Sequence, residues 1–275
     1  MNKDNRIELW SMYHENTKHF PHIVHTLPLS EGELADLMRK GAKSYPTASR
    51  VRLKSIKTTS GISLEDALFR RRSIRVFSIK AIPVSSISRL LQLSYGVSGY
   101  SFLNTRGETY RYDLRTAPSA GALFSCEVYL AALNIRNLKK GIYHYSPGHN
   151  ELEILTLNND IGKLMNESII DAAVFQNWAA SLIITGTFRK AITKYGERGY
   201  RYILLDAGHI GQNIYLAANA LDLGVVGVCG FYDDKVNDVL SLDSQDESAL
   251  YMILLGQIDK KRKRSGQAWR ENVSV

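Results

Sequence analysis

The chain has 275 residues, of which 44% are hydrophobic and 23% are charged, and it contains two cysteines. These are the proportions of an ordinary globular protein, and they exclude a disordered, collagen-like or coiled-coil chain. The start, Met1 to Arg6, leads into a polar stretch, and no apolar run approaches the ~18 residues that predict a membrane span. Cys126 and Cys229 lie far apart without a Cys-x-x-Cys partner. We therefore expect a cytoplasmic protein with no membrane contact, no disulfide and no zinc site.

The formal net charge is +8, and five of the cations form one run, Lys260 to Arg264. Such a run near the end of a chain can be a solvated tail, an attraction for nucleic acid, or a clamp for the phosphate of a bound cofactor. No recognition-helix, RNA-binding or zinc-finger pattern accompanies it, so we expect no nucleic-acid partner. Residues 261–275 are interpreted as a basic C-terminal tail.

The first part of the chain, residues 1–62, is predicted to be an N-terminal arm with some helix. Ser30 and Glu33 form a capping box that opens a short helix, the stretch before it is interpreted as irregular, and residues 42–62 as a connector. Ser63 predicts the start of a second helix. Pro83 predicts the start of a third, which ends at Gly96.

The remainder alternates between buried strands and one long helix. Apolar runs predict strands at 128–133, 142–145, 152–155, 181–188, 225–231 and 249–255. A stripe of apolar and small residues at helical spacing predicts a helix over 202–223. The predicted fold class is α+β, with a mixed or antiparallel sheet packed against a long central helix.

Arg71, Arg72, Ser73 and Arg75 follow the second predicted helix. Guanidinium forks and a hydroxyl at this spacing can surround a phosphate. The alternative interpretation is an amphipathic turn at the surface.

Two runs of small residues border predicted strands. Residues 117–123, which include Pro118, Ser119 and Gly121, could let a flat ligand lie against the backbone, or could be a close-packed turn. At the end of the strand 225–231, backbone amides beside Gly230 could face the polar edge of an aromatic cofactor, or the strand could simply end tightly. Cys229 is interpreted as a small buried hydrophobe.

The segment from Lys194 to Arg201 places three cations, two tyrosines and two glycines between a strand and the long helix. It can be a solvated loop or a loop that closes on a ligand. In a dry site, like-charge repulsion from Arg198 and Arg201 would lower the pKa of Lys194 and make it a better base near neutral pH. No Gly-x-Gly-x-x-Gly, P-loop or His-Glu-x-x-His pattern occurs, which disfavours nicotinamide, nucleoside-triphosphate and zinc-protease chemistry.

Taken in order, these motifs resemble the SagB-type thiazoline and oxazoline dehydrogenases of the flavin nitroreductase-like superfamily. The resemblance covers 63–257, with some similarity also over 9–19. It is carried by the following segments: Arg71 to Arg75, Pro118 to Leu123, Gly141 to Tyr145, Lys194-Tyr195 with Arg198 to Arg201, Asp206 to His209, and Gly230-Phe231. This chain has Phe124-Ser125 where the family usually has Tyr-Pro, a difference that bears on the substrate pocket more than on the flavin.

The resemblance implies a nitroreductase-like domain over 63–260, an interlocked homodimer and non-covalently bound FMN. It implies that the FMN phosphate and ribityl chain are bound by Arg71, Arg72, Ser73 and Arg75, with Lys261 and Arg264 completing the clamp. It implies that Pro118, Ser119 and Gly121 of the partner subunit line the flavin ring, whose N5 and O4 edge meets the backbone at Cys229 and Gly230. No metal is implied.

The resemblance also implies a reaction and assigns Lys194 and Tyr195 as its catalytic pair. A peptide azoline would lose a proton from Cα and a hydride from Cβ to become an azole, with oxygen as the final electron acceptor. The partners implied are a modified precursor peptide and a cyclodehydratase. Two alternatives remain: an NAD(P)H-dependent nitroreductase or flavin oxidoreductase, and an FMN dehydrogenase of another peptide or amino-acid-derived substrate.

Overall fold

The computed structural model describes residues 8–19, 29–39, 43–54, 61–105 and 107–259. Within these residues, one eight-stranded sheet forms the centre of the molecule, in the order β1-β9-β8-β6-β10-β12-β11, with β2 paired to β12. Every strand pair in this sheet is antiparallel. The strands are β1 (Arg50–Arg52), β2 (Phe77–Ser78), β6 (Cys126–Ala132), β8 (Gly141–Ser146), β9 (Glu151–Leu157), β10 (Ala180–Thr187), β11 (Leu223–Val228) and β12 (Glu247–Ile258).

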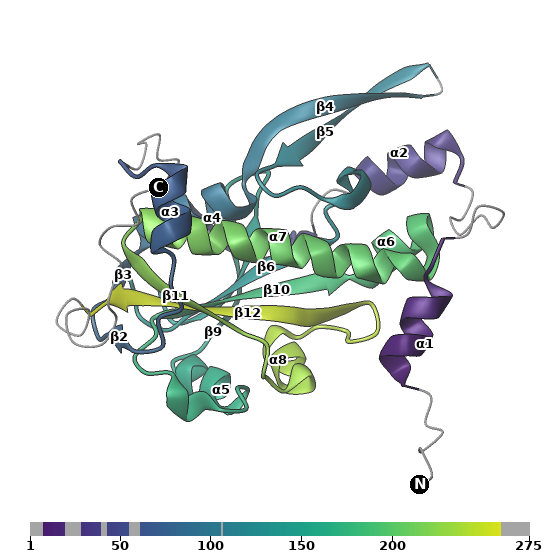
Figure 1. Cartoon of the computed structure of the whole chain (residues 1–275). Helices are drawn as coiled ribbons and strands as arrows, with labels where there is room; N and C mark the ends of the chain where they lie inside the picture. The colour runs from purple at the N-terminus through teal and green to yellow at the C-terminus, as the bar shows by residue number, and fades with distance from the viewer. Residues whose placement is uncertain (1–7, 20–28, 40–42, 55–60, 106, 260–275) are drawn as a thin grey trace, which may run out of the picture.

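Helices cover both faces of the sheet (Figure 1). The long helix α7 lies across one face together with α4, while α5 and α8 lie on the other. The helices are α1 (Leu9–Asn16), α2 (Glu31–Arg39), α3 (Leu64–Arg70), α4 (Val84–Tyr95), α5 (Ile161–Glu167), α6 (Phe188–Tyr195), α7 (Gly199–Ala220) and α8 (Asp233–Leu240), with short 3-10 turns η1 (Ala120–Ala122), η2 (Ala172–Val174) and η3 (Gly196–Arg198). The predicted α+β class is therefore confirmed, and the sheet is antiparallel.

Successive side chains along the central strands point to opposite faces of the sheet, and both faces carry apolar side chains that helices bury. In β6, Val128 and Leu130 join the core beneath α7, while Tyr129 and Ala131 join the core beneath α5 and α8. All seven residues of this strand are buried, as expected for a strand between two apolar layers. The continuous apolar run in the sequence is thus a strand covered on both sides.

Two predicted helix starts are confirmed by their caps. Glu33 N donates to Ser30 Oγ at 3.3 Å and Ser30 N donates to the Glu33 carboxylate at 2.8 Å, which is the expected capping box. Asp66 N donates to Ser63 Oγ at 3.0 Å and opens α3. Gly96 ends α4, as predicted.

A hairpin that the sequence analysis did not identify projects from the sheet layer (Figure 1). Its strands are β4 (Val97–Thr105) and β5 (Glu108–Arg115), which pair antiparallel and contact α2 at the edge of the molecule. A further small pair, β3 (Ile82–Pro83) with β7 (Ile135–Arg136), runs parallel. Among the described residues, no helix is long and apolar enough to cross a membrane.

The N-terminal region contains a helix where an irregular stretch was expected. Helix α1 packs at the start of α7: the rings of Tyr13 and Tyr200 lie edge to face at 5.8 Å, Arg198 donates to the carbonyl of Thr17, and Arg201 contacts His14 Nδ1 at 3.2 Å. An isolated helix of eight residues is marginal in water, so these contacts explain its formation better than its own sequence does.

A cluster of charged side chains is buried within the sheet layer. His144 contacts Glu153 through Nδ1 at 2.8 Å and Glu127 through Nε2 at 3.1 Å, and all three side chains are at most 3% exposed. Burial lowers the pKa of His144, but hydrogen bonds to the two carboxylates outweigh it and raise the pKa above 6.5. His144 therefore compensates Glu127 and shares Glu153 with Arg50, which lies 3.5 Å from the Glu153 carboxylate.

We predict that His144→Phe lowers the free energy of unfolding by about 3–5 kcal/mol, because buried Glu127 loses its ion-pair partner and buried Glu153 keeps only Arg50. Since the pKa of His144 is raised in the folded chain, its stabilisation is complete below about pH 6.5 and is lost as the pH rises through the folded value. Urea unfolding across this pH range tests both points. The exposed His149→Phe is the control and should change stability by less than about 0.5 kcal/mol; equal effects at both positions would contradict the assignment.

Candidate functional site

Lys194 and Tyr195 form the end of helix α6, which leads through η3 directly into α7. The prediction of a loop over this segment is wrong. The helical signal was present, because Phe188, Ala191, Ile192 and Tyr195 stand at i, i+3, i+4 and i+7. The density of cations and glycines after Ile192 obscured it.

The two side chains of this pair face the same feature, the turn η1. A Cβ placed on Gly121 would lie 2.2 Å from Tyr195 Oη and 2.5 Å from Lys194 Nζ, so both head groups reach the glycine backbone. Gly121 also has a φ of +58°, a conformation that favours glycine. The structure thus brings together the predicted catalytic pair and the predicted small-residue turn within one chain. Pro118, also predicted in this turn, is exposed beside it.

Helix α7 fixes the position of Tyr195 from the other side. The rings of Tyr195 and Tyr202 meet edge to face, with centroids 4.9 Å apart and planes at 87°. Lys194 Nζ lies 5.2 Å from the centroid of the Tyr195 ring. The pair is therefore enclosed between α7 and η1.

Asp206 of α7 holds the turn itself. Ser119 Oγ donates to Asp206 Oδ2 at 2.5 Å, the amide of Ala120 donates to Oδ1 at 3.3 Å, and the amide of Phe124 donates to Ser119 Oγ at 2.9 Å. Ala122 and Phe124 both have positive φ values, 53° and 51°. Non-glycine residues in this region are strained and persist only where surrounding contacts hold them, as this carboxylate does.

Burial separates the pKa values of the two catalytic candidates. Desolvation lowers the pKa of Lys194 and raises the pKa of Tyr195, to which the neighbouring Tyr202 and Asp206 also contribute. Lys194 thereby becomes a better base and Tyr195 remains a hydrogen-bond donor near neutral pH.

The predicted direction for Lys194 holds, but its predicted cause is wrong. Arg198 and Arg201 do not act on Lys194; they contact Tyr202 and helix α1 instead.

The predicted phosphate-binding residues gather around Tyr215, near the other end of α7. The guanidinium carbon of Arg71 lies 5.2 Å from the Tyr215 ring centroid, and Ser73 Oγ lies 3.3 Å from Tyr215 Oη. Arg72 turns back toward the end of α3, where its Nη1 donates to the carbonyl of Phe69 at 2.8 Å. Arg75 is exposed. Arg71 and Ser73 are thus assembled on one surface, and Arg72 is directed away from it.

The end of β11 lies beside this group. Gly227 N donates to Tyr215 Oη at 2.6 Å, and a Cβ on Gly227 would lie 2.0 Å from the hydroxyl of Tyr251. Burial raises the pKa of Tyr251 to about 12, with smaller contributions from Tyr215 and Cys229. Cys229 is exposed, so its interpretation as a buried hydrophobe is wrong. Gly230 is exposed next to it.

Two predicted clamp residues, Lys261 and Arg264, lie outside the described residues. No sequence motif predicts a role for Asp206, Tyr202 or Tyr215 in the site. Asp206 could have been found, because it is a carboxylate bordering the buried stripe of α7. Among the described residues, no group of His, Cys, Asp and Glu could hold a metal ion.

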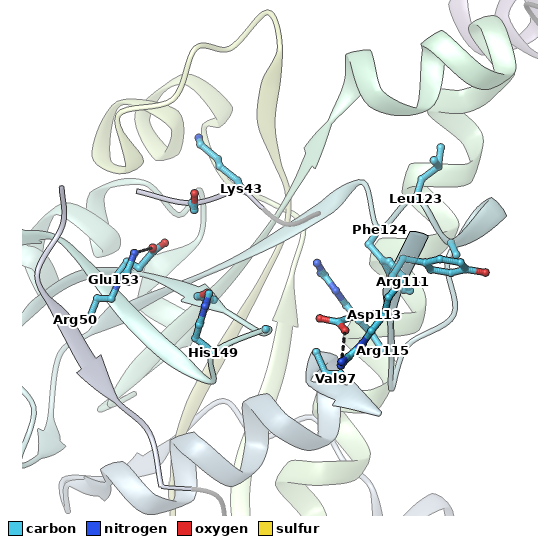
Figure 2. A pocket seen from close by; sticks show the side chains of 15 residues that line it. Lys43, Arg50, Val97, Arg111, Asp113, Arg115, Leu123, Phe124, His149 and Glu153 are labelled. Carbon is cyan, nitrogen blue, oxygen red and sulfur yellow. Dashed lines mark hydrogen bonds and ion pairs between the residues drawn. The ribbon is translucent and has the colours of Figure 1, made fainter. Parts of the chain in front are cut away.

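A pocket of about 440 Å³ lies on the other side of the turn η1 (Figure 2). Ala122, Leu123 and Phe124 line it directly after Gly121. The opposite wall carries Lys43, Arg50, Glu153 and His149. Gly121, which meets Lys194 and Tyr195, is thus the residue directly before the pocket lining.

The family model described as the nitroreductase family matches residues 68–257. This is well over half of the chain, and the chain belongs to the nitroreductase family.

Comparison with curated proteins gives two kinds of relative. The nitroreductase-like protein MJ1384 of Methanocaldococcus jannaschii is 30% identical over 200 residues, covering 73% of this chain and 92% of the relative. The microcin B17-processing protein McbC of Escherichia coli is 31% identical over 149 residues, or 53% of this chain and 55% of McbC. The chain thus matches nearly all of the first relative and about half the length of the second.

Solved structures agree on the fold. A nitroreductase-like protein from Anabaena variabilis superposes with a TM-score of 0.62 at 26% identity, covering 94% of this chain and 48% of that one. A chain of the E. coli microcin synthetase McbBCD complex, solved with truncated pro-MccB17 bound, gives a TM-score of 0.56 at 24% identity, covering 87% and 85%. At this identity, the second likeness concerns the fold alone.

We predict that Gly121→Ala destabilises the chain by about 1–3 kcal/mol and displaces the Lys194–Tyr195 pair, because a methyl group there meets both head groups and must adopt a positive φ. Urea unfolding gives the stability. Gly99→Ala is the matched control, since a Cβ at Gly99 meets nothing within 4 Å. Equal stability of the two variants would show that the turn is not closely packed.

Proposed function

We propose that this protein is an FMN-dependent dehydrogenase that oxidises peptide thiazolines or oxazolines to azoles. One observation carries the proposal: a lysine with lowered pKa and a neutral tyrosine converge on the backbone of Gly121. A nitroreductase that only passes electrons from NAD(P)H has no need of such a base. The similarity to McbC, a microcin-processing protein, supports a peptide substrate.

Family membership supports a flavin, and the residues present fit one. Arg71 and Ser73 offer a guanidinium and a hydroxyl to an anionic phosphate, and Arg75 is exposed nearby in sequence. The exposed backbone at Gly230, where a Cβ would meet only Ile170 at 3.9 Å, leaves room for a flat ring to approach. When bound, FMN supplies the acceptor for the hydride and passes electrons on to oxygen.

The chain's own residues provide the rest of the chemistry. In the proposed reaction, Lys194 Nζ takes the proton from Cα of the azoline ring as the hydride leaves Cβ. Tyr195 stays protonated and donates a hydrogen bond that orients the ring. Asp206 contacts no reacting atom in this scheme; it positions the turn η1 through Ser119 and Ala120.

A homodimer completes the proposed site. Asp206 and Tyr215 are nine residues apart on α7, which is about 14 Å along the axis and half a turn around it. The Lys194–Tyr195 group and the Arg71 group of one chain therefore face different directions. The outer face of α7 exposes Leu204 and Leu205, the latter at 60%, and no atom lies within 4 Å of a Cβ at Gly208. This face favours packing against a second copy, whose turn η1 would meet the flavin bound at Arg71.

A cyclodehydratase is the proposed supplier of the substrate, because azolines are formed by loss of water from Cys, Ser or Thr residues. Similarity to McbC, a microcin B17-processing protein, over part of its length supports a peptide-processing role for this chain. The alternative with its own support is an NAD(P)H-dependent nitroreductase, since the match to MJ1384 covers nearly all of that relative.

We predict that Lys194→Ala lowers the rate of azole formation by about 10²–10⁴-fold while FMN stays bound, as expected for loss of a general base. Because burial lowers the pKa of Lys194, the wild-type rate should rise with pH to a plateau that begins below the usual lysine value. Tyr195→Phe should keep this pH profile at a lower rate. The measurement is the loss of two mass units from a cyclised peptide across pH 6–10.

Lys163→Ala, at an exposed lysine of α5, is the control and should behave as wild type. Wild-type azoline oxidation by Lys194→Ala would rule out the base assignment. Reduction of a nitroaromatic by NADPH, with no oxidation of any azoline, would favour the nitroreductase alternative.

We predict that Arg71→Ala weakens FMN binding by about ten- to a hundredfold, because it removes a charge-assisted contact to phosphate. The matched control is Arg70→Ala, the preceding residue, whose guanidinium pairs with Asp66 at 3.2 Å and is exposed. FMN titration followed by flavin fluorescence gives both affinities, and sedimentation of the loaded wild type should give a dimer. Unchanged affinity in Arg71→Ala, or a flavin-loaded monomer, would contradict the proposed site.

A further inference from the structure

The pocket beside η1 is lined by more cations than anions. Its walls contain the following charged residues: Lys43, Arg50, Arg111, Arg115, Asp113 and Glu153. Both acidic residues already have a partner, because Asp113 pairs with Arg111 at 3.7 Å and Glu153 with Arg50 at 3.5 Å. Lys43 pairs with the buried Glu247 at 2.7 Å. Three of the four cations are therefore compensated.

Arg115 is the fourth cation, and it is held in place without a counterion. Its guanidinium lies 4.2 Å from the ring centroid of Tyr95 and 4.8 Å from that of Phe124. Its Nη1 is buried and has no hydrogen-bond partner, and no acidic side chain of the described residues lies within ion-pair distance of it. Two aromatic faces orient the fork but provide no acceptor for its N–H groups.

An uncompensated, buried guanidinium atom is costly, and such groups in native proteins usually have a partner. The complement of a planar guanidinium fork is a carboxylate, which accepts two N–H bonds at once. Figure 2 shows Arg115 with Asp113 and Arg111 on one wall, facing Lys43 and His149 across the opening. A carboxylate entering the pocket would meet one guanidinium without a counterion, that of Arg115, among cations that already have acidic partners.

The pocket also adjoins the proposed reaction centre. Ala122 lines the pocket, and its neighbour Gly121 contacts Lys194 and Tyr195. Consecutive Cα atoms are about 3.8 Å apart. The pocket and the Lys194–Tyr195 pair thus lie against consecutive residues of the same turn.

We propose that this pocket is a specificity site that binds a carboxylate of the peptide substrate through Arg115. The carboxylate is either an acidic side chain near the azoline or the C-terminal α-carboxylate of the peptide. The identity of the ligand as a peptide rests on the proposed function; the preference of the pocket for a carboxylate does not.

The binding test uses small probes and needs no catalysis. N-acetylglutamate α-amide carries only a side-chain carboxylate, N-acetylalanine carries only an α-carboxylate, and N-acetylglutamine α-amide carries neither. We expect at least one acidic probe to bind the wild-type protein about tenfold or more tightly than the neutral probe, by calorimetry or NMR titration. The acidic probe that binds more tightly shows whether the pocket prefers a side-chain carboxylate or a C-terminal α-carboxylate. Equal binding of all three probes, or none, would overturn the proposal.

Two variants locate the effect. Arg115→Gln should abolish the preference for the acid, whereas Arg52→Gln removes the same charge from a side chain that is 86% exposed and should leave the preference intact. Asp113→Asn removes a competing carboxylate from the pocket and should strengthen binding of the acidic probe. If Arg115→Gln fails to fold, unchanged or weaker binding in Asp113→Asn overturns the proposal. Preference retained in a folded Arg115→Gln would also overturn it.

A second arm connects the pocket to the reaction. Azoline peptides in matched pairs, Glu against Gln or free acid against amide, should differ by about tenfold in kcat/KM with the wild type and should not differ with Arg115→Gln. If no azoline peptide is oxidised while the acidic probes still bind through Arg115, the proposed function fails and the carboxylate site stands. If peptides are oxidised without regard to charge, the specificity site is wrong and the proposed function stands.

Discussion

The hydrogen bonds from Ser119 and Ala120 to the carboxylate of Asp206 are the interaction on which the rest of the site depends. They hold a turn whose backbone would not adopt this shape alone, since Gly121, Ala122 and Phe124 all have positive φ. One face of that turn meets Lys194 and Tyr195, and the other lines the pocket. A single buried carboxylate on the central helix therefore determines two surfaces at once.

The pKa of that carboxylate is consistent with this role. Burial raises the pKa of Asp206, and its hydrogen bonds to Ser119 and Ala120 oppose the rise. Because desolvation outweighs these hydrogen bonds, the pKa of Asp206 is raised, and protonation of this carboxylate would weaken the acceptor that holds the turn. The electrostatic interaction with the nearby His209 also lowers the pKa of Asp206 and so favours the charged carboxylate that holds the turn.

Much of the layout could be predicted from the sequence because it depends on local signals. The central strands β6 and β10 are runs of mostly apolar residues that are buried on both faces, and the helix starts at Ser30 and Ser63 are side-chain caps; both are properties of neighbouring residues. The hairpin β4–β5 was missed because its exposed pattern resembles a polar connector. Helix α1 was missed because its formation depends on contacts with residues more than 180 positions away. The position of Arg115 between two rings likewise depends on tertiary structure that no short pattern encodes.

Helix α1 has an electrostatic consequence for the catalytic pair. Arg198 and Arg201 stand only four and seven residues after Lys194, yet their guanidinium groups point to Thr17 and His14. The carbonyl and hydroxyl oxygens of Thr17 accept hydrogen bonds from these two guanidinium groups. The pKa of Lys194 is therefore lowered by desolvation and not by repulsion from neighbouring cations. A segment that is remote in sequence thus holds the guanidinium groups of Arg198 and Arg201 away from the ammonium group of Lys194.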